Sequence, residues 1–362
     1  MMDMPSPNTS LINSIPSSFP WISQMQWIKY FGENKMKIKN IFVTGASGKI
    51  GRALLPELVS VGYHVRALEF EEPLECKDVE IMKGDVRDPQ LARKALLDMD
   101  AVIHLANCKE NRELFMETNI HGTFYLLDEA KNCGHIKQFI QAGSDARAGI
   151  FYYPHPYPID ETYPHSAYPG YYAFSKVLEE VMCEQYIIQY KLPITILRFS
   201  WVHDEDDFLC HITLREPNFG VPIWKELAKS PEQKSYFEKD IDAIAKLVHP
   251  GGKPGIRHIV SIKDAVQGVI LAIGNPSAIG QAFTITGPSP FSYGFAAEYI
   301  SKKLNLPIVE FEDDKFYDFT HNIAKSRSIL GYDPKDDLAK IIDDAIEFRE
   351  SGKKRHPTKY IG

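Results

Sequence analysis

The stretch from Ile41 to Gly51, Ile-Phe-Val-Thr-Gly-Ala-Ser-Gly-Lys-Ile-Gly, constrains the fold of this chain more than any other. A run of β-branched and aromatic residues leads into Gly45, Gly48 and Gly51, and a segment with leucines at helical spacing follows. A strand, a glycine-rich turn and a helix in this order are typical of a dinucleotide-binding unit. The sequence therefore predicts that the turn and the N–H groups that begin the helix bind a pyrophosphate.

Strand-like and helix-like segments alternate from this stretch to residue 199. The further strands are expected at 63–68, 79–83, 101–106, 138–142 and 194–199. This alternation predicts an α/β fold, with a doubly wound parallel Rossmann sheet and a smaller C-terminal α/β substrate domain. Ligands of such sheets bind beyond the carboxyl ends of the strands. The residues expected there are Gly45, Glu69, Asp85, Ala106 and Ser144.

The chain divides into four expected parts. Residues 1–36, rich in Ser, Pro and Asn and then in aromatic residues, form an N-terminal extension. They are interpreted either as an arm that packs or swaps, or as an upstream start that adds little. The other parts are an NAD-binding domain (37–203, with 257–275 returning to it), a substrate-binding domain (204–256 and 276–350) and a basic tail (351–362) that is expected to fray.

Two carboxylates at the strand ends are candidates for contacts with an adenosine. Glu69 stands about 20 residues after the glycines, where an acidic side chain accepts hydrogen bonds from ribose hydroxyls. Because a carboxylate would repel a 2′-phosphate, NAD is favoured over NADP. Alternatively, Glu69 opens a solvated acidic run with Glu71 and Glu72. Asp85 lies where an adenine could bind, and its alternative role is that of a turn former.

The candidate catalytic residues are Ser144, Tyr172 and Lys176. Tyr172 and Lys176 are four residues apart and should share one helical face. A neighbouring ammonium favours the phenolate and should lower the pKa of the phenol from about 10. Tyr172 can then take a proton from a substrate hydroxyl as hydride leaves the same carbon, while Ser144 hydrogen-bonds the carbonyl that forms.

The composition argues against several other classes of protein. The net charge of −7 gives no reason to expect nucleic-acid binding, and no stretch approaches the roughly 18 apolar residues of a membrane span. The five cysteines form neither a CxxC pair nor a metal spacing, so we expect no metal site. Reduced thiols in a cytoplasmic protein are the simplest interpretation.

Together these motifs resemble the extended short-chain dehydrogenase/reductase family, the NAD-dependent epimerases and dehydratases. The motifs that carry the resemblance, beside Ser144, are Thr44–Gly51, Gly84–Asp88, His104–Ala106, Asn119–Thr123, Tyr172–Lys176, Leu197–Phe199, Arg257–Asp264 and Ala324–Pro334. The resemblance implies that Ser144, Tyr172 and Lys176 are catalytic and that Asn119 supports the proton path. It implies cofactor contacts at Gly45, Ser47, Gly48, Lys49, Ile50, Gly51, Glu69, Asp85, Val86, Leu105, Ala106, Tyr172 and Lys176. Family members are often dimers through the helices that hold Asn119 and Tyr172.

Departures from the family pattern narrow the chemistry. Ser144-Asp145-Ala146 replaces the Thr-Asp-Glu run of sugar-nucleotide dehydratases, so dehydration is not expected. Trp201 stands where epimerases of the family often carry an Asn that meets substrate phosphates. Arg257 matches the family's phosphate-facing arginine, and its alternative partner is the acidic run 204–207. Substrate contacts are expected at Ser144, Asp145, Trp201 and Arg257.

We therefore expect an NAD-dependent sugar enzyme. A nucleotide-sugar epimerase that works through a transient keto intermediate is the leading hypothesis. The alternatives are an NAD-dependent dehydrogenase of a free sugar or sugar acid and, in another class, a non-catalytic NAD-binding regulator. The intact pair of Tyr172 and Lys176 argues against the regulator.

Overall fold

A seven-stranded parallel sheet forms the centre of the computed structural model, which describes residues 35–215 and 218–356. The N-terminal extension up to residue 34 therefore lies outside the described residues. The strand order is β11-β6-β5-β4-β1-β2-β3, and each neighbouring pair is parallel. The strands are β1 (Asn40–Thr44), β2 (His64–Glu69), β3 (Val79–Lys83), β4 (Ala101–His104), β5 (Gln138–Ser144), β6 (Ile194–Phe199) and β11 (Gln281–Ile285). The predicted doubly wound sheet is confirmed.

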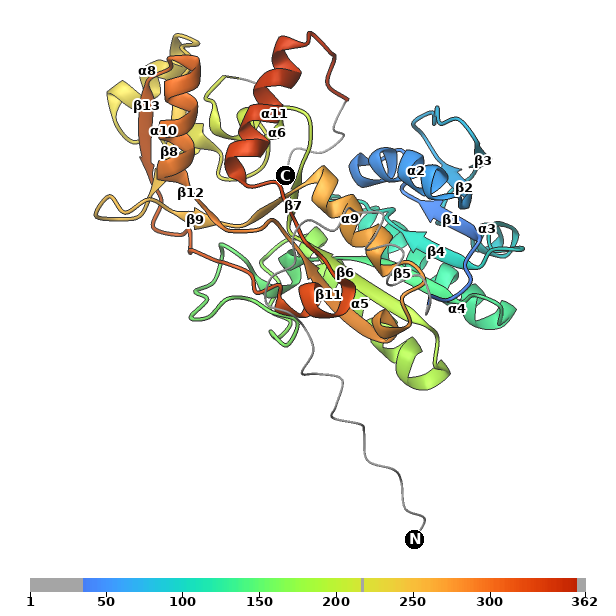
Figure 1. Cartoon of the computed structure of the whole chain (residues 1–362). Coiled ribbons are helices and arrows are strands. Elements are labelled where there is room, and N and C mark those ends of the chain that lie inside the picture. The colour runs from blue at the N-terminus through green and yellow to red at the C-terminus, as the bar shows by residue number, and fades with distance from the viewer. Residues whose placement is uncertain (1–34, 216–217, 357–362) are drawn as a thin grey trace, which may run out of the picture.

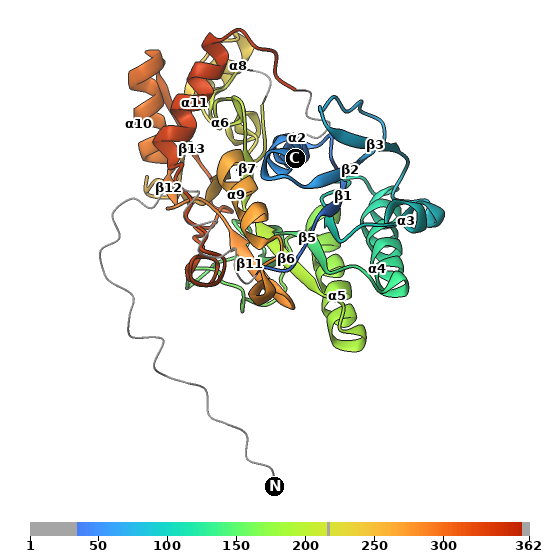
Figure 2. The same cartoon turned by 45° about the vertical axis from the view of Figure 1, so that its right-hand side comes forward.

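Helices cover both faces of this sheet (Figures 1 and 2). On β1, Ile41 and Val43 join the core under α2 and α9, whereas Phe42 between them joins the core under α3, α4 and α5. All three side chains are fully buried, as expected for a central parallel strand that is covered on both sides. The α-helices are α2 (Lys49–Val61), α3 (Pro89–Ala95), α4 (Gly122–Cys133), α5 (Tyr171–Tyr190) and α9 (Ile262–Ala272). A short π-helix, η2 (Met116–His121), and a short 3₁₀-helix, η3 (Asp145–Ala148), accompany them.

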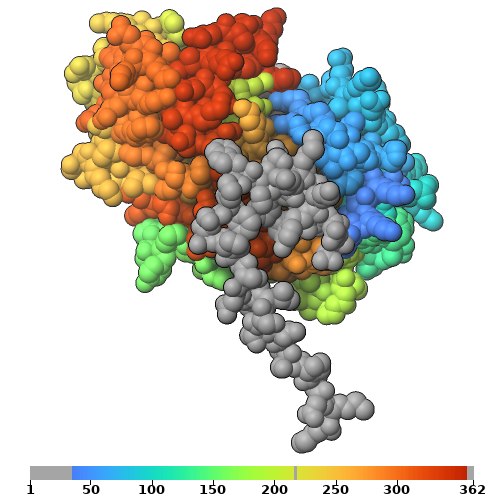
Figure 3. All heavy atoms as spheres, in the orientation of Figure 1, coloured from blue at the N-terminus to red at the C-terminus, as the bar shows by residue number. Residues whose placement is uncertain are grey.

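The C-terminal part forms a second lobe with its own apolar core, seen in yellow, orange and red at the upper left of Figure 3. Its elements are α6 (Asp207–Ile212), α7 (Trp224–Leu227), α8 (Pro231–Glu238), β8 (Ile244–Val248), α10 (Tyr293–Leu304), β13 (Ile308–Glu312) and α11 (Leu338–Glu350). Two small strand pairs connect the lobes: β7 (Trp201–His203) with β10 (Ile259–Ser261), and β9 (Ile256–Arg257) with β12 (Phe291–Ser292). The short 3₁₀-helix η4 (Pro276–Ala278) and the short π-helix η5 (Ser326–Leu330) complete the described elements.

Two expectations about the chain's organisation need correction. The segment 281–285 was placed in the substrate domain, but it is the edge strand β11 of the Rossmann sheet and pairs with β6. The tail was expected to fray from Ser351, yet Arg355 forms ion pairs with Asp206 and Asp207. Opposite charges therefore anchor the tail as far as His356, the last described residue.

Among the described residues, no helix is long and apolar enough to cross a membrane.

A buried ion-pair network joins α5 to β6. Glu180 is 1% exposed and binds the guanidinium groups of Arg198 and Arg147. We predict that Glu180→Gln lowers the free energy of unfolding by about 3 kcal/mol, because two buried cations lose their counter-ion. Urea unfolding measures this effect. Asp240→Asn, which breaks an exposed pair, should leave the midpoint unchanged; equal midpoints for both variants would contradict the prediction.

Candidate active site

The glycine-rich turn packs tightly against the ends of its neighbours. Gly45 has φ +63°, and a Cβ there would lie 2.5 Å from the carbonyl carbon of Leu105. A Cβ on Gly51 would lie 2.4 Å from the Gly45 carbonyl oxygen. Gly48 is the N-cap of α2 and provides no side-chain cap, and the first turn holds no acidic residue. The turn therefore leaves the N–H groups that begin α2 without a competing side chain.

A buried hydrogen-bond chain holds the ends of β1 and β4 together. The Thr44 hydroxyl lies 2.6 Å from His104 Nδ1 and accepts hydrogen bonds from the amides of Leu105 and Ala106, both at 3.2 Å. His104 Nε2 lies 3.0 Å from the Thr123 hydroxyl. Burial lowers the pKa of His104 to about 3, so the ring is neutral. These contacts fix the start of the loop after β4, which leads toward Tyr172.

The two carboxylates at the β2 and β3 ends have protein partners. Glu69 accepts a hydrogen bond from the amide of Leu74 at 2.8 Å, which lowers the pKa of Glu69, and lies 3.3 Å from Lys83 Nζ. Glu69 is buried, so the alternative interpretation, a solvated acidic run that begins at Glu69, does not hold. Asp85 accepts from the amide and guanidinium of Arg87 at 2.9 and 2.8 Å, in the turn-forming role. Adenosine contacts of both carboxylates stay predictions.

Ser144, Tyr172 and Lys176 come together at the carboxyl edge of the sheet. Ser144 is the last residue of β5, and its hydroxyl lies near enough to the Tyr172 phenol to lower the pKa of the phenol. Lys176 Nζ lies 5.8 Å from the centroid of the Tyr172 ring, on the same face of α5. The carboxylate of Glu110 accepts hydrogen bonds from the Tyr171 and Tyr172 amides at 2.8 and 3.3 Å. An acidic side chain from the loop after β4 thus caps the helix that carries the phenol.

The expected lowering of the Tyr172 pKa is wrong in direction. Burial raises the pKa of Tyr172 more than the hydrogen bond with Ser144 lowers it. Lys176 Nζ donates to the Ala142 carbonyl at 3.0 Å and to Glu179 Oε2 at 2.8 Å. Both Lys176 and Glu179 are buried, so the carboxylate offsets the charge of the ammonium next to the phenol. Glu179, three residues along α5, could have been found by helical spacing.

Lys109 is a site residue that the sequence analysis missed. Its ammonium lies 5.0 Å from the centroid of the Tyr172 ring, nearer than that of Lys176. Burial, together with the ammonium groups of Lys49 and Lys176, lowers the pKa of Lys109 to about 8. The sequence could have indicated Lys109 as a site residue through its position in the loop after β4, because ligands of these folds bind beyond the carboxyl ends of the strands.

This pKa predicts a pH-dependent difference in stability. The unfolded Lys109 titrates near 10.5 and the folded one near 8, so between these values the unfolded chain binds more protons. The free energy of unfolding of the wild type, relative to Lys109→Met, should therefore rise by about 2 kcal/mol as the pH is raised from 8 to 10.5. Urea titrations at several pH values measure it. Lys225→Met, at an exposed position, should show no such trend, and a flat difference for Lys109→Met would contradict the prediction.

Asn119 is fully buried in η2 and holds the loop after β4. Its Nδ2 donates to the Cys108 carbonyl at 2.7 Å and to the Ser175 hydroxyl at 2.8 Å, and its Oδ1 accepts from the Cys108 amide at 2.7 Å. These bonds tie the loop to α5. A role for Asn119 in the proton path stays a prediction.

The predicted substrate residues Trp201 and Arg257 lie against one another. The guanidinium of Arg257 lies 4.0 Å from the Trp201 ring centroid and donates to the Val221 carbonyl at 2.7 Å. Arg257 is only 3% exposed. Its alternative pairing with the run 204–207 is wrong, because residues of that run bind the cations Lys49, Arg349 and Arg355.

An aromatic column extends from this pair to the glycine-rich turn. Trp201 stacks on Phe219 at 5.1 Å between ring centroids, and Lys49 Nζ lies 4.4 Å from the Phe219 centroid. Lys49 also forms an ion pair with Asp207. The column links the predicted pyrophosphate turn to the predicted substrate residues.

The residues at this edge fit a dinucleotide. The start of α2 offers amides without a side-chain cap, and the ammonium groups of Lys49 and Lys109 supply positive charge for a pyrophosphate. The amide of Asn107, on the loop after β4, is buried and both of its polar atoms lack a partner among the described residues. Buried polar atoms without partners are costly in a folded chain, and a bound polar ligand would satisfy them.

Comparison with known proteins also points to an NAD-binding domain in the segment that holds the glycine-rich turn and Tyr172. Residues 41–205 match the model of the NAD dependent epimerase/dehydratase family. The uncharacterized protein y4nG of Sinorhizobium fredii is 30% identical over 166 residues, which span 44% of this chain and 40% of that protein. The UDP-glucose 4-epimerase of Rhizobium meliloti is 26% identical over 334 residues, or 86% of this chain and 97% of the epimerase.

A solved structure shows the same fold over most of the chain. It is a short-chain dehydrogenase/reductase superfamily protein from Agrobacterium tumefaciens with bound NAD. Its TM-score is 0.73 at 24% identity, and the match covers 86% of this chain and 98% of that protein.

The fold is that of a Rossmann-type α/β domain, which the chain shares with this NAD-bound structure. Residues 41–205 form a domain of the NAD dependent epimerase/dehydratase family. Its cofactor is accordingly NAD.

Proposed function

We propose that this protein uses NAD to oxidise a secondary alcohol of a sugar substrate, with Ser144, Tyr172 and Lys176 as the catalytic residues. The observation that carries the proposal is the meeting of three side chains at the carboxyl edge of the sheet: Ser144 at the end of β5, the Tyr172 phenol, and the buried Lys176 ammonium, 5.8 Å from the Tyr172 ring centroid. NAD, when bound, supplies the hydride acceptor. Tyr172 takes the hydroxyl proton, Ser144 donates a hydrogen bond to the developing carbonyl, and Lys176 contributes positive charge next to the phenol.

The finer proposal is a nucleotide-sugar epimerase. The UDP-glucose 4-epimerase of Rhizobium meliloti matches this chain over nearly its whole length. An epimerase returns the hydride to the other face of a transient ketone, so the same residues act twice and no proton is lost overall. Arg257, which the family resemblance assigns to substrate phosphates, supports this proposal.

A dehydrogenase of a free sugar or sugar acid is the second candidate. The burial of the Arg257 guanidinium by two aromatic rings favours it. The guanidinium is almost fully buried between Trp201 and Phe151, at 4.0 and 5.4 Å from their ring centroids. A sugar diphosphate would have to displace these rings to reach it. A small free sugar would not need this contact.

A reaction panel separates the candidates. The protein is incubated with NAD and with UDP-sugars, free sugars and sugar acids, while NADH absorbance and proton NMR spectra are recorded. Net NADH identifies a dehydrogenase, and inversion at one carbon without net NADH identifies an epimerase. NAD binding without reaction of any compound would instead support the non-catalytic regulator.

We further propose a cytoplasmic homodimer formed through α4 and α5. The five cysteines are unpaired thiols, which is common in reducing compartments. Phe124 on α4 and Phe174, Val181 and Ile188 on α5 are exposed, with Ile188 at 60%. Light scattering should give twice the chain mass, and Ile188→Glu should give the monomer mass. A monomeric wild type would contradict this proposal.

A further inference from the structure

The helix that carries Tyr172 begins without a cap of its own. Gly170, the N-cap residue of α5, offers no side chain, and the first turn holds no acidic residue. The first N–H groups of a helix have no acceptor within the helix. Here the amides of Tyr171 and Tyr172 donate to the carboxylate of Glu110, at 2.8 and 3.3 Å. Glu110 lies 61 residues before Tyr171, in the loop after β4, so the cap comes from another element of the fold.

Gly170 leaves room for this carboxylate. Its φ is +154° and its ψ is 152°, a backbone conformation that essentially only glycine adopts. A Cβ on Gly170 would lie 2.8 Å from Glu110 Oε1 and 3.3 Å from Glu110 Cδ. The usual N-cap residues Ser, Thr, Asp and Asn would therefore push the carboxylate aside. The start of α5 thus takes its cap from Glu110 and not from the N-cap position.

The loop that holds Glu110 is fixed on both sides of this residue. Before Glu110, the amide and the carbonyl of Cys108 both bond the buried side chain of Asn119, at 2.7 Å each. After Glu110, Asn111 Oδ1 accepts hydrogen bonds from the amides two and three residues later, both at 3.0 Å. The carboxylate is therefore presented to α5 by a well-held backbone.

Tyr172 needs this support because of its place in the helix. It is the second residue of α5, and helix ends open more readily than the middle of a helix. Lys176, one turn further in, has its own contacts with the Ala142 carbonyl and with Glu179. A first turn that frays would thus move the phenol while Lys176 stays in place. Misplacement of a reacting group by about 1 Å can lower a rate about 100-fold.

We propose that Glu110 is a positioning residue, whose carboxylate holds the first turn of α5 and so fixes the Tyr172 hydroxyl relative to the substrate and NAD. This proposal rests on the proposed function. Glu110 acts through the backbone of Tyr172 and exchanges no proton with the substrate. Lys109, its neighbour in the chain, lies 5.0 Å from the Tyr172 ring centroid, so one loop contacts both the backbone and the ring of this residue.

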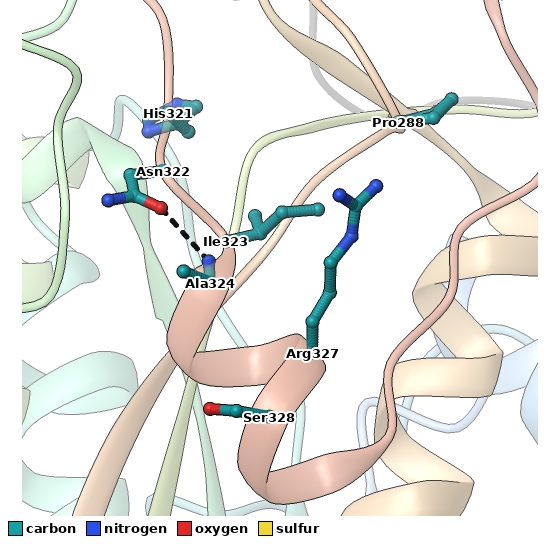
Figure 4. A pocket seen from close by; sticks show the side chains of 7 residues that line it. All are labelled: Pro288, His321, Asn322, Ile323, Ala324, Arg327 and Ser328. Carbon is teal, nitrogen blue, oxygen red and sulfur yellow. Dashed lines mark hydrogen bonds between the residues drawn. The ribbon is translucent and has the colours of Figure 1, made fainter. Parts of the chain in front are cut away.

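The Ser144 side of the site is supported separately. Asp145, the residue after Ser144, places its Oδ2 3.2 Å from Nε2 of His321. His321 lines a surface hollow of about 590 Å³ with Asn322 and Arg327 (Figure 4). The described residues that line this hollow come from 288 and 321–328, and none of them comes from α5 or the loop after β4. Changes at Glu110 should therefore leave this side of the site intact.

Kinetics of variants at Glu110 test the proposal, with NAD and the compound that reacts in the panel. Glu110 is exposed, so Glu110→Ala leaves no buried cavity and should fold. We expect it to lower kcat about tenfold, with KM and the dissociation constant for NAD within about twofold, because the phenol is displaced but neither binding site is lost. Glu110→Gln keeps an acceptor oxygen and should stay within about threefold of the wild type. Glu113→Ala, which removes an exposed carboxylate nearby, should have the wild-type kcat.

The outcomes separate this proposal from the proposed function. A wild-type kcat in Glu110→Ala, with Tyr172→Phe inactive, would overturn this proposal and leave the proposed function standing. Equal losses in Glu110→Ala and Glu110→Gln would also overturn it, because they would assign the effect to the charge of Glu110 and not to its hydrogen bonds. An active Tyr172→Phe would instead overturn the proposed function.

Gly170→Ala provides an independent test of the contact. Its Cβ should expel the carboxylate from the wild-type site, whereas Glu110→Ala leaves no carboxylate to expel. The loss of kcat caused by Gly170→Ala should therefore be about threefold smaller in the Glu110→Ala background than in the wild type. Losses that multiply independently would contradict the proposal.

Hydrogen exchange tests the same contact without a substrate. In NMR spectra of the full chain, the amides of Tyr171 and Tyr172 should exchange about tenfold faster in Glu110→Ala than in the wild type. Glu113→Ala should leave both exchange rates unchanged. Wild-type exchange of both amides in Glu110→Ala would overturn the proposal.

Discussion

Replacement of Tyr172 by phenylalanine should lower kcat by about 10³-fold while the dissociation constant for NAD changes less than about threefold. The phenol is the group that contacts both Ser144 and the predicted position of the substrate hydroxyl, and phenylalanine cannot carry a proton. The ring itself stays, so its contacts with Lys109 and Lys176 and the packing of α5 are preserved. Steady-state kinetics with the substrate from the panel and calorimetric titration with NAD measure both quantities.

Tyr168→Phe is the matched control for this loss. Tyr168 is partly buried four residues earlier and is not assigned a catalytic role. Its replacement should leave kcat within about threefold of the wild type. Equal losses in both variants would show that the effect is a general disturbance of the segment before α5, and would contradict a specific role of the Tyr172 hydroxyl.

Replacement of Gly45 by alanine should abolish measurable NAD binding and lower the free energy of unfolding by about 3 kcal/mol. The positive φ of Gly45 costs a non-glycine residue about 1–2 kcal/mol, and its Cβ would overlap the backbone of Leu105 and Ala106. Backbone atoms cannot move aside as a flexible side chain can, so the turn must shift. A shifted turn no longer aligns the amides that begin α2 with a pyrophosphate.

Gly134→Ala separates the effect of a positive φ from the effect of a Cβ that overlaps neighbouring backbone. Gly134, after α4, has φ +66°, close to that of Gly45, but a Cβ there meets no atom within 4 Å. Its replacement should cost only the conformational strain, about 1 kcal/mol, and should leave NAD binding intact. Thermal unfolding and calorimetry compare the variants. Unchanged NAD affinity in Gly45→Ala would contradict the role of the turn.

Local patterns predicted the first six strands of the Rossmann sheet well, because each is a short segment that contains apolar residues and is followed by a turn or a helix. The continuous apolar run predicted as a strand at 101–106 forms β4, which ends at His104 and is fully buried. Edge strand β11 was assigned to the wrong domain, because its partner β6 lies more than 80 residues earlier and nothing local marks a long-range pairing. The anchoring of Arg355 by the acidic run was missed for the same reason.

The positions of the site residues were more predictable than their partners. Spacing alone placed Tyr172 and Lys176 on one face of α5. Spacing did not show that the Lys176 ammonium would pair with the carboxylate of Glu179. It also did not show that burial would raise the pKa of the Tyr172 phenol. His321, 176 residues from Asp145, carried no sequence signal, because only the tertiary fold brings the two together.

The central claim is that the glycine-rich turn and Tyr172 serve one nicotinamide cofactor. A crystal structure of the protein with NAD tests this most directly. The account predicts the pyrophosphate at the N-terminus of α2 and the reactive nicotinamide carbon within about 5 Å of the Tyr172 oxygen, close enough for a substrate carbon between them. A nicotinamide that faces away from Tyr172, or a dinucleotide bound elsewhere on the molecule, would contradict it.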